Sequence, residues 1–311
     1  APEAKVIHVD VDPAEIGKNR IPQIPIVGDA KVVLAGMKEQ LDKDGYEPKT
    51  KEWLEQIEEW RSRHPFYSPG LVALNGSISP EGSLDLLSDM LDPENSIITT
   101  EVGQHQMWAA QHIDREVPRT FLTSGGLGTM GFGFPAAIGA KVACPEKEVV
   151  CVDGSFQMNS QEMATAAAEG INVKVLLMNN SALGMVHQWQ NLFYEKRYSE
   201  TLLPDIPDFV KLCDAYGWGG KRVSKPEELE EAFTWLLNYD GPALLDMRID
   251  RDENVFPMVA PGAPLDDIIG ATNVGPISHM LEGFEDLPFA NAAEANEAAR
   301  NAADSNEEGG Q

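Results

Sequence analysis

From about residue 80 to residue 249, short apolar runs alternate with helix-like amphipathic runs. The apolar runs include SIITT, EVVCV, VKVLLMN and PALLDMRI, and each is short enough to be a strand. Strands that are apolar throughout are typical of a parallel sheet with helices on both faces. The sequence therefore predicts an α/β domain, in which ligands bind beyond the carboxyl ends of the strands.

The rest of the chain predicts three further regions. Residues 1–48 hold two short strand-like runs and one helix-like run, which we interpret as the end of an α/β middle domain. Residues 49–79 combine an amphipathic helix with a linker rich in Pro, Gly, Asn and Ser. The sheet domain is predicted over residues 80–281, and the acidic residues 282–311 are expected to be disordered. Because the chain starts without Met and directly on a strand-like run, we expect an upstream part to be missing.

Composition excludes several classes of protein. A formal net charge of −26 repels phosphate backbones, so we expect no nucleic-acid partner. Neither a long apolar run nor a signal peptide is present, which predicts no membrane span and a cytoplasmic location. Cys144, Cys151 and Cys213 lack metal-ligand spacing, so we expect free thiols.

Four polar or glycine-rich segments follow predicted strands, and a parallel sheet brings them to one edge: EVGQHQMW (101–108), TSGGLGTMGFGFP (123–135), VDGSFQMN (152–159) and MNNSALGMVHQWQ (178–190). Asp153 can offer a carboxylate to a cation, while Gly154 and Ser155 can offer backbone N–H groups to a phosphate. Asn180 can add a neutral oxygen to the same ion, a combination that fits Mg²⁺. Taken alone, the dipeptides DG and NN more often mean a helix cap and a turn.

Two of these segments also suggest close contact with a ligand. GGLGTMGFGFP has five glycines in eleven residues, which indicates either a tight strand-to-helix turn or backbone that approaches a ligand. His105 lies between two glutamines at a predicted helix start, where it is a candidate anion contact.

Together the segments resemble the thiamine-diphosphate enzymes, whose signature is GDG followed by NN one strand–helix–strand unit later. More narrowly, the chain resembles the large catalytic subunits of acetolactate synthase, also called acetohydroxyacid synthase. The resemblance rests on GQHQMWAAQ, GGLGTMGFGFPAAIGA, DGSFQMNSQE, MNNSALGMVHQWQNLFYEKRYSET and VFPMVAPGAPL. Residues 4–40 resemble the end of that family's FAD-associated middle domain, and residues 80–270 resemble its diphosphate-binding domain.

The resemblance implies roles for particular residues. Mg²⁺ is expected on Asp153, Asn180 and the backbone carbonyl of Ala182. The expected cofactor-binding residues are Gln104, His105, Gly128, Met130, Gly154, Ser155 and Asn180. Met130 is expected beneath the thiazolium ring, where it helps to hold thiamine diphosphate in the bent form that brings its amino nitrogen next to the reactive carbon.

Trp189 and Met185, four residues apart on one helix face, are expected to line the substrate cavity. The family implies that Trp189 influences the choice of acceptor. Alternatively, both residues belong to an apolar helix stripe that packs in the core.

The implied reaction is the decarboxylation of pyruvate and carboligation to a second 2-keto acid, either pyruvate or 2-ketobutyrate. The family further implies a transferase of isoleucine and valine biosynthesis, a homo-oligomer with active sites between subunits, FAD, and a possible regulatory small subunit. In this family a glutamate hydrogen-bonds the aminopyrimidine ring of the cofactor. That glutamate lies on an N-terminal domain, which a partner subunit contributes. We therefore expect this chain to hold half an active site, to lack most of the FAD site, and to be inactive alone.

Two departures from the family pattern accompany these matches. Val152 stands where the signature has glycine, and the strand before Asp153 is about two residues shorter, which is expected to draw Asp153 back from the metal. Two alternatives stay open. One is another thiamine-diphosphate 2-keto acid decarboxylase, oxidase or carboligase; the other is a non-catalytic cofactor-binding module.

Overall fold

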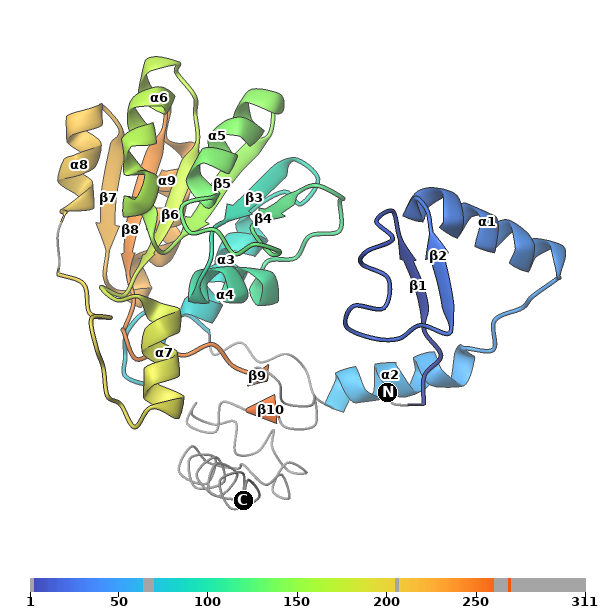
Figure 1. Cartoon of the computed structure of the whole chain (residues 1–311). Helices are drawn as coiled ribbons and strands as arrows, with labels where there is room; N and C mark the ends of the chain where they lie inside the picture. Colours follow the sequence, from blue (N-terminus) through green and yellow to red (C-terminus); the bar gives the residue numbers. More distant parts are fainter. Residues whose placement is uncertain (1–2, 64–69, 205–206, 260–267, 270–311) are drawn as a thin grey trace. The chain divides into compact units, whose positions relative to one another are not determined.

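The computed structural model describes residues 3–63, 70–204, 207–259 and 268–269 (Figure 1). The chain divides into two compact units, one ending at Phe66 and the other beginning at Tyr67. This division falls within the region predicted as helix and linker. The predicted tail, 282–311, and the end of the predicted sheet domain, 270–281, lie outside the described residues.

The first unit contains a two-stranded parallel sheet and two helices. The sheet pairs β1 (Ile7–Asp10) with β2 (Ile24–Val27), and α1 (Ala30–Lys43) and α2 (Lys51–Arg63) follow. Helix α1 begins where the Asp29 side chain accepts a hydrogen bond from the Val32 N–H. No residue of these four elements is fully buried, so the unit encloses little apolar surface.

A parallel sheet forms the centre of the second unit. In spatial order its strands are β4 (Phe121–Thr123), β3 (Ser96–Thr100), β5 (Glu148–Asp153), β6 (Lys174–Asn179), β8 (Ala243–Arg248) and β7 (Gly219–Val223). All neighbouring pairs are parallel, which confirms the predicted fold class. After β3 the chain goes to β4 on one side and then to β5 on the other, so the order reverses at β3. Such a reversal opens a crevice at the carboxyl ends of the strands.

Helices cover both faces of this sheet (Figure 1). One apolar cluster draws on α3 (Pro80–Met90), α4 (Gln104–His112) and α9 (Leu229–Asn238), and the other on α5 (Gly133–Ala143), α6 (Met163–Ala168) and α8 (Phe209–Tyr216). Along β5, Val150 and Val152 belong to the first cluster, whereas Val149 and Cys151 belong to the second. This alternation explains why the strand is apolar at every position.

The remaining elements show where the sequence prediction was incomplete. After β5 the chain forms a 3₁₀ segment, η1 (Phe156–Glu162), before α6, and Asn159 within it has a non-helical φ of −136°. The prediction omitted β7, whose sequence GGKRV is not apolar because it forms a sheet edge. It also omitted the two-residue strands β9 (Met258–Val259) and β10 (Ile268–Ile269). The other elements are α7 (Gly184–Phe193) and η2 (Pro226–Glu228).

Two expectations from composition can be compared with the structure. None of the described helices is long and apolar enough to cross a membrane. The three cysteines are free, and Cys151 and Cys213 are buried, so the expectation of free thiols is confirmed.

Candidate active site

A cavity of about 660 Å³ opens at the carboxyl ends of the central strands. Nine sequence-predicted site residues line it: Gln104, His105, Met130, Gly154, Ser155, Asn180, Ala182, Met185 and Trp189. Gly128 and Asp153 are not among the described residues of its wall. The parallel sheet thus brings together most of the residues that the four strand-end segments supplied.

The N-termini of α4 and α7 both reach this cavity. Helix α4 follows Gly103 and α7 follows Leu183, and neither helix has a side-chain cap in the described structure. Gly103 and Leu183 are themselves part of the cavity wall. Uncapped first-turn N–H groups and the positive end of the helix dipole favour an anion, so the wall suits a phosphate group.

His105 adds a side-chain donor to the same wall. It is 4% exposed, and its Nε2 has no hydrogen-bond partner in the described part of the chain. Burial lowers the pKa of His105 to about 4, and the opposing effect of Glu101 is smaller. At neutral pH the ring is therefore uncharged, and in the tautomer protonated at Nε2 it can donate one hydrogen bond to a phosphate.

Gly154 provides space beside this histidine. A Cβ atom at Gly154 would lie 2.5 Å from His105 Nδ1, closer than atoms can approach without displacement. The unpartnered Nε2, the two uncapped helices and this glycine cradle fit the diphosphate of thiamine diphosphate.

Asp153 is buried at the end of β5 and is not among the described residues that line the cavity. It is the last residue of β5, is 1% exposed, and accepts a hydrogen bond of 2.9 Å from the Ser155 N–H at Oδ1. Burial raises the pKa of Asp153 well above its usual range, and the charge and hydrogen bond of Glu101 raise it further. Val152 is an ordinary strand residue paired with Thr100 and Leu176, and β5 continues through it to Asp153, which pairs with Leu177.

Glu101 is a buried residue of this site to which the sequence analysis gave no role. It is 0% exposed and accepts hydrogen bonds from the N–H of Gly131 and from the N–H and hydroxyl of Ser155. Both Ser155 donors therefore face carboxylates. The predicted roles of Asp153 on a metal and of Ser155 on a diphosphate would require these contacts to open. The sequence feature that could have identified Glu101 is its position directly after the apolar strand SIITT.

Asn180 and Ala182 offer neutral oxygens for a cation. Asn180 Oδ1 accepts a hydrogen bond of 3.1 Å from the Ala182 N–H and retains a second lone pair. Ser181 between them has a φ of 53°, a strained backbone conformation that is enriched at functional sites. Among the described residues, no group of three or more His, Cys, Asp or Glu is placed to hold a metal ion. A cation here would therefore complete its shell with phosphate oxygens and water, as Mg²⁺ commonly does.

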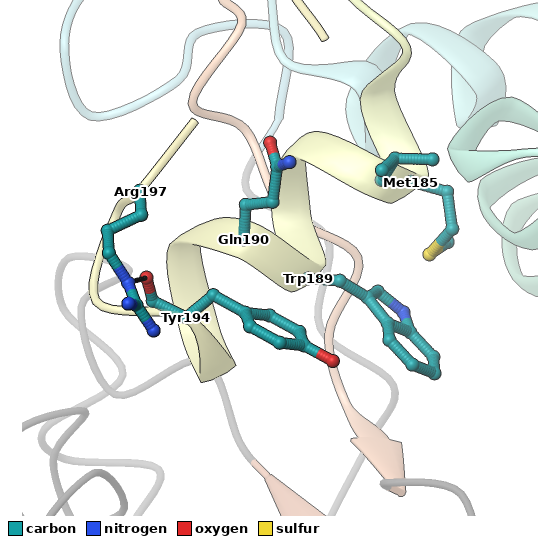
Figure 2. A pocket seen from close by; sticks show the side chains of 6 residues that line it. Met185, Trp189, Gln190, Tyr194 and Arg197 are labelled. Carbon is teal, nitrogen blue, oxygen red and sulfur yellow. Dashed lines mark hydrogen bonds between the residues drawn. The ribbon is translucent and has the colours of Figure 1, made fainter. Parts of the chain in front are cut away.

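A second cavity, of about 550 Å³, lies along α7. Its wall consists of Met185, Val186, Trp189, Gln190, Tyr194 and Arg197 (Figure 2). Met185, Val186 and Trp189 belong to both cavities. Figure 2 shows Met185 and Trp189 on the same side of α7. The Trp189 ring also packs edge-on against the Phe193 ring, with 5.9 Å between the ring centroids. The two predicted substrate residues are thus together, next to the phosphate-binding features.

Family comparison assigns the chain to a class that fits this cavity. The model described as "Thiamine pyrophosphate enzyme, C-terminal TPP binding domain" matches residues 101–247, and the one described as "Thiamine pyrophosphate enzyme, central domain" matches residues 1–37. The first match contains all four strand-end segments. The chain belongs to the thiamine pyrophosphate enzymes.

Within this class the chain is similar to acetolactate synthases. It is 47% identical to the acetolactate synthase of Mycobacterium leprae over 89% of the chain and 45% of that protein. It is 45% identical to the acetolactate synthase isozyme 2 large subunit of Escherichia coli over 85% of the chain and 46% of that protein. It is 44% identical to the acetolactate synthase large subunit of Parasynechococcus marenigrum over 87% of the chain and 43% of that protein. The predicted family is confirmed, and the chain spans about half the length of these relatives.

Proposed function

We propose that this chain forms the thiamine-diphosphate-binding part of an acetolactate synthase large subunit. The reaction is a transferase reaction of isoleucine and valine biosynthesis. It gives 2-acetolactate from two pyruvate molecules, or 2-aceto-2-hydroxybutyrate from pyruvate and 2-ketobutyrate. One observation carries the proposal: a cavity with two uncapped helix N-termini and the unpartnered His105 Nε2 shares its wall with a second cavity lined by Trp189.

The phosphate-binding end is assigned to the start of α4, the start of α7, His105 and the space at Gly154. Mg²⁺ is assigned to Asn180 Oδ1 and the Ala182 carbonyl. Asp153 would become a further ligand when its contact with Glu101 opens. Gly128 is not among the described residues of the cavity wall. We propose that it contributes to cofactor binding only as a member of the glycine-rich loop.

Thiamine diphosphate, when bound, supplies the nucleophilic carbon that decarboxylates pyruvate and joins the remaining two-carbon unit to the acceptor. The chain's own residues position the reactants and exclude water. Met130 is 39% exposed on the cavity wall, where it can support the thiazolium ring. Trp189 and Met185 shape the space for the acceptor and keep water from the reacting carbon.

The proposed assembly includes further components. The wall residues in the described part of the chain include no carboxylate, so the glutamate that bonds the aminopyrimidine would come from another domain, across a homo-oligomer interface. We also propose that the enzyme contains FAD, whose site would lie mostly on its other parts, and that it binds a regulatory small subunit. The proposed location is the cytoplasm.

Complementation tests this function. The chain is co-expressed with the N-terminal half of the Escherichia coli isozyme 2 large subunit, and the complex is assayed with pyruvate, thiamine diphosphate and Mg²⁺. We expect 2-acetolactate by mass spectrometry, and a loss of at least about tenfold for Asn180→Ala because a metal ligand is removed. An assembled complex that decarboxylates pyruvate without forming 2-acetolactate would point to another enzyme of the class.

The buried contact of Asp153 with Glu101 favours a second candidate, a module that does not perform catalysis. In this case Asp153 stays bonded to Glu101 and the cation site never forms. An assembled complex with no turnover and no Mg²⁺-dependent cofactor binding would favour this candidate.

A further inference from the structure

Two buried glutamines connect α7 and α4 to the segment after β8. Gln188 and Gln104 are 1% and 3% exposed, and Gln104 Nε2 donates to Gln188 Oε1 at 2.8 Å. Gln188 meets both backbone groups of Val255: its Nε2 donates to the Val255 carbonyl at 3.1 Å, and its Oε1 accepts from the Val255 N–H at 2.9 Å. Backbone groups have fixed donor and acceptor roles, so Val255 fixes which way the Gln188 amide faces.

The orientation of one amide determines the orientation of the next. Gln188 presents its oxygen to Gln104, so Gln104 must present its nitrogen, and the Glu253 carbonyl accepts from the same nitrogen at 2.8 Å. The oxygen of Gln104 then faces Asn180, which donates from Nδ2 at 3.2 Å. With its nitrogen committed, Asn180 directs Oδ1 to the other side, toward the Ala182 N–H.

The segment at the start of this series is part of the cavity. Pro257, Met258 and Val259 line the larger cavity, and Gln188 Nε2 lies 3.2 Å from the Met258 sulfur. We name residues 250–259 the strap. The strap therefore contacts the cavity directly through its last residues and reaches Asn180 indirectly through the two glutamines.

We propose that Gln188 and Gln104 are positioning residues that transmit the orientation of the strap backbone to Asn180, so that Asn180 offers its oxygen to the cation while the strap is docked. The proposal rests on the function proposed above. A flipped Asn180 amide would present N–H groups to a cation and repel it, and outer-shell partners of this kind commonly hold metal ligands in place. Gly184 leaves room for the arrangement, since a Cβ there would lie 2.1 Å from Gln104 Oε1 and 2.7 Å from Asn180 Nδ2.

NMR of the full chain tests this without activity. The protein is deuterated and labelled with ¹⁵N-asparagine, and Asn180→Asp identifies the Asn180 side-chain amide by its missing signals. Gln188→Met keeps the side-chain volume and removes the amide. Gln190→Met is the matched control on the same helix, because the Gln190 amide bonds Thr201 and Ser199 instead.

We expect Gln188→Met to shift the Asn180 amide signals and to speed their hydrogen exchange about tenfold, the size expected for loss of about one hydrogen bond. Gln190→Met should leave them unchanged. Unchanged Asn180 signals in folded Gln188→Met, or equal changes in both variants, would overturn the proposal. If Gln188→Met does not fold, wild-type protein labelled with ¹⁵N-glutamine decides: side-chain amides of Gln104 and Gln188 that exchange at unprotected rates would contradict the connection.

Binding provides a second readout. In titrations with thiamine diphosphate, the Mg²⁺ concentration needed for half-maximal binding should rise about tenfold in Gln188→Met and stay unchanged in Gln190→Met. A Gln188→Met value equal to the wild type would refute the effect on the cation. Wild-type protein that does not bind the cofactor would contradict the proposed function, while the NMR result would still decide whether the glutamines orient Asn180.

Discussion

Replacing Gly184 with alanine should destabilise the protein, although alanine is the better helix former. Gly184 is the first residue of α7 and borders the cavity. An added Cβ would overlap Gln104 Oε1 at 2.1 Å and Asn180 Nδ2 at 2.7 Å. Gln104 cannot easily move away, because it is 3% exposed and bonded to Gln188, Glu253 and Asn180.

The expected size follows from opposing effects. Displacing the Gln104 amide breaks about two hydrogen bonds, at about 1 kcal/mol each. Overpacking a buried site adds about 1 kcal/mol or more. The intrinsic gain of alanine over glycine in a helix is at most about 1 kcal/mol. The free energy of unfolding should therefore fall by about 2 kcal/mol.

Urea denaturation followed by near-ultraviolet circular dichroism measures this change. Gly139→Ala is the matched control, because Gly139 is an exposed residue of α5 and a Cβ there meets nothing within 4 Å. The control should gain about 0.5 to 1 kcal/mol. A Gly184→Ala protein that is as stable as the control would refute the close packing argued for the amide network.

Three further outcomes are expected. Burial raises the pKa of Glu253 from about 4.5 in the unfolded chain to about 7 in the folded protein. The wild type therefore loses stability as the pH rises from about 4.5 to about 7, because the buried carboxyl group becomes charged. Glu253→Gln should therefore gain more stability over the wild type at pH 8 than at pH 5, and an equal gain at both would contradict this cause. Asp246 is 0% exposed and accepts hydrogen bonds of 2.8 Å from Arg222 and Asn179. Asp246→Asn should therefore lower the free energy of unfolding by about 3 kcal/mol, because the charge of Arg222 loses its buried partner. A loss under about 1 kcal/mol would contradict a stabilising role for this ion pair. The purified chain alone, given pyruvate, thiamine diphosphate and Mg²⁺, should form no 2-acetolactate in a colorimetric assay, because no described wall residue is a carboxylate; sustained product formation would disprove this.

The sequence predicted those parts of the fold that local patterns determine. Strands such as EVVCV are buried on both faces, so their composition identifies them as parallel strands. The edge strand β7 lacked this signal, since GGKRV has few apolar residues to bury. The break in the helix near Asn159 depends on tertiary contacts, because the Asn159 amide donates to the Gly131 carbonyl at 2.6 Å.

The candidate site was predictable in its location but not in its internal contacts. Strand-end segments converge on one edge in any parallel sheet, which explains why nine predicted residues share a wall. The contact of Asp153 with Glu101 spans 52 positions, and that of Gln188 with Val255 spans 67, so neither leaves a local pattern. These contact partners could be identified only from the three-dimensional structure, which brings distant parts of the chain together.

Isothermal titration of thiamine diphosphate into the purified chain measures whether this cavity binds the cofactor through a cation. We expect binding in Mg²⁺, loss of binding in EDTA, and at least about tenfold weaker binding for Asn180→Ala. Gly154→Ala should also weaken binding, because its Cβ displaces His105 from the wall. Absence of binding in Mg²⁺, or binding that EDTA and both substitutions leave unchanged, would contradict the claim that this cavity holds the cofactor.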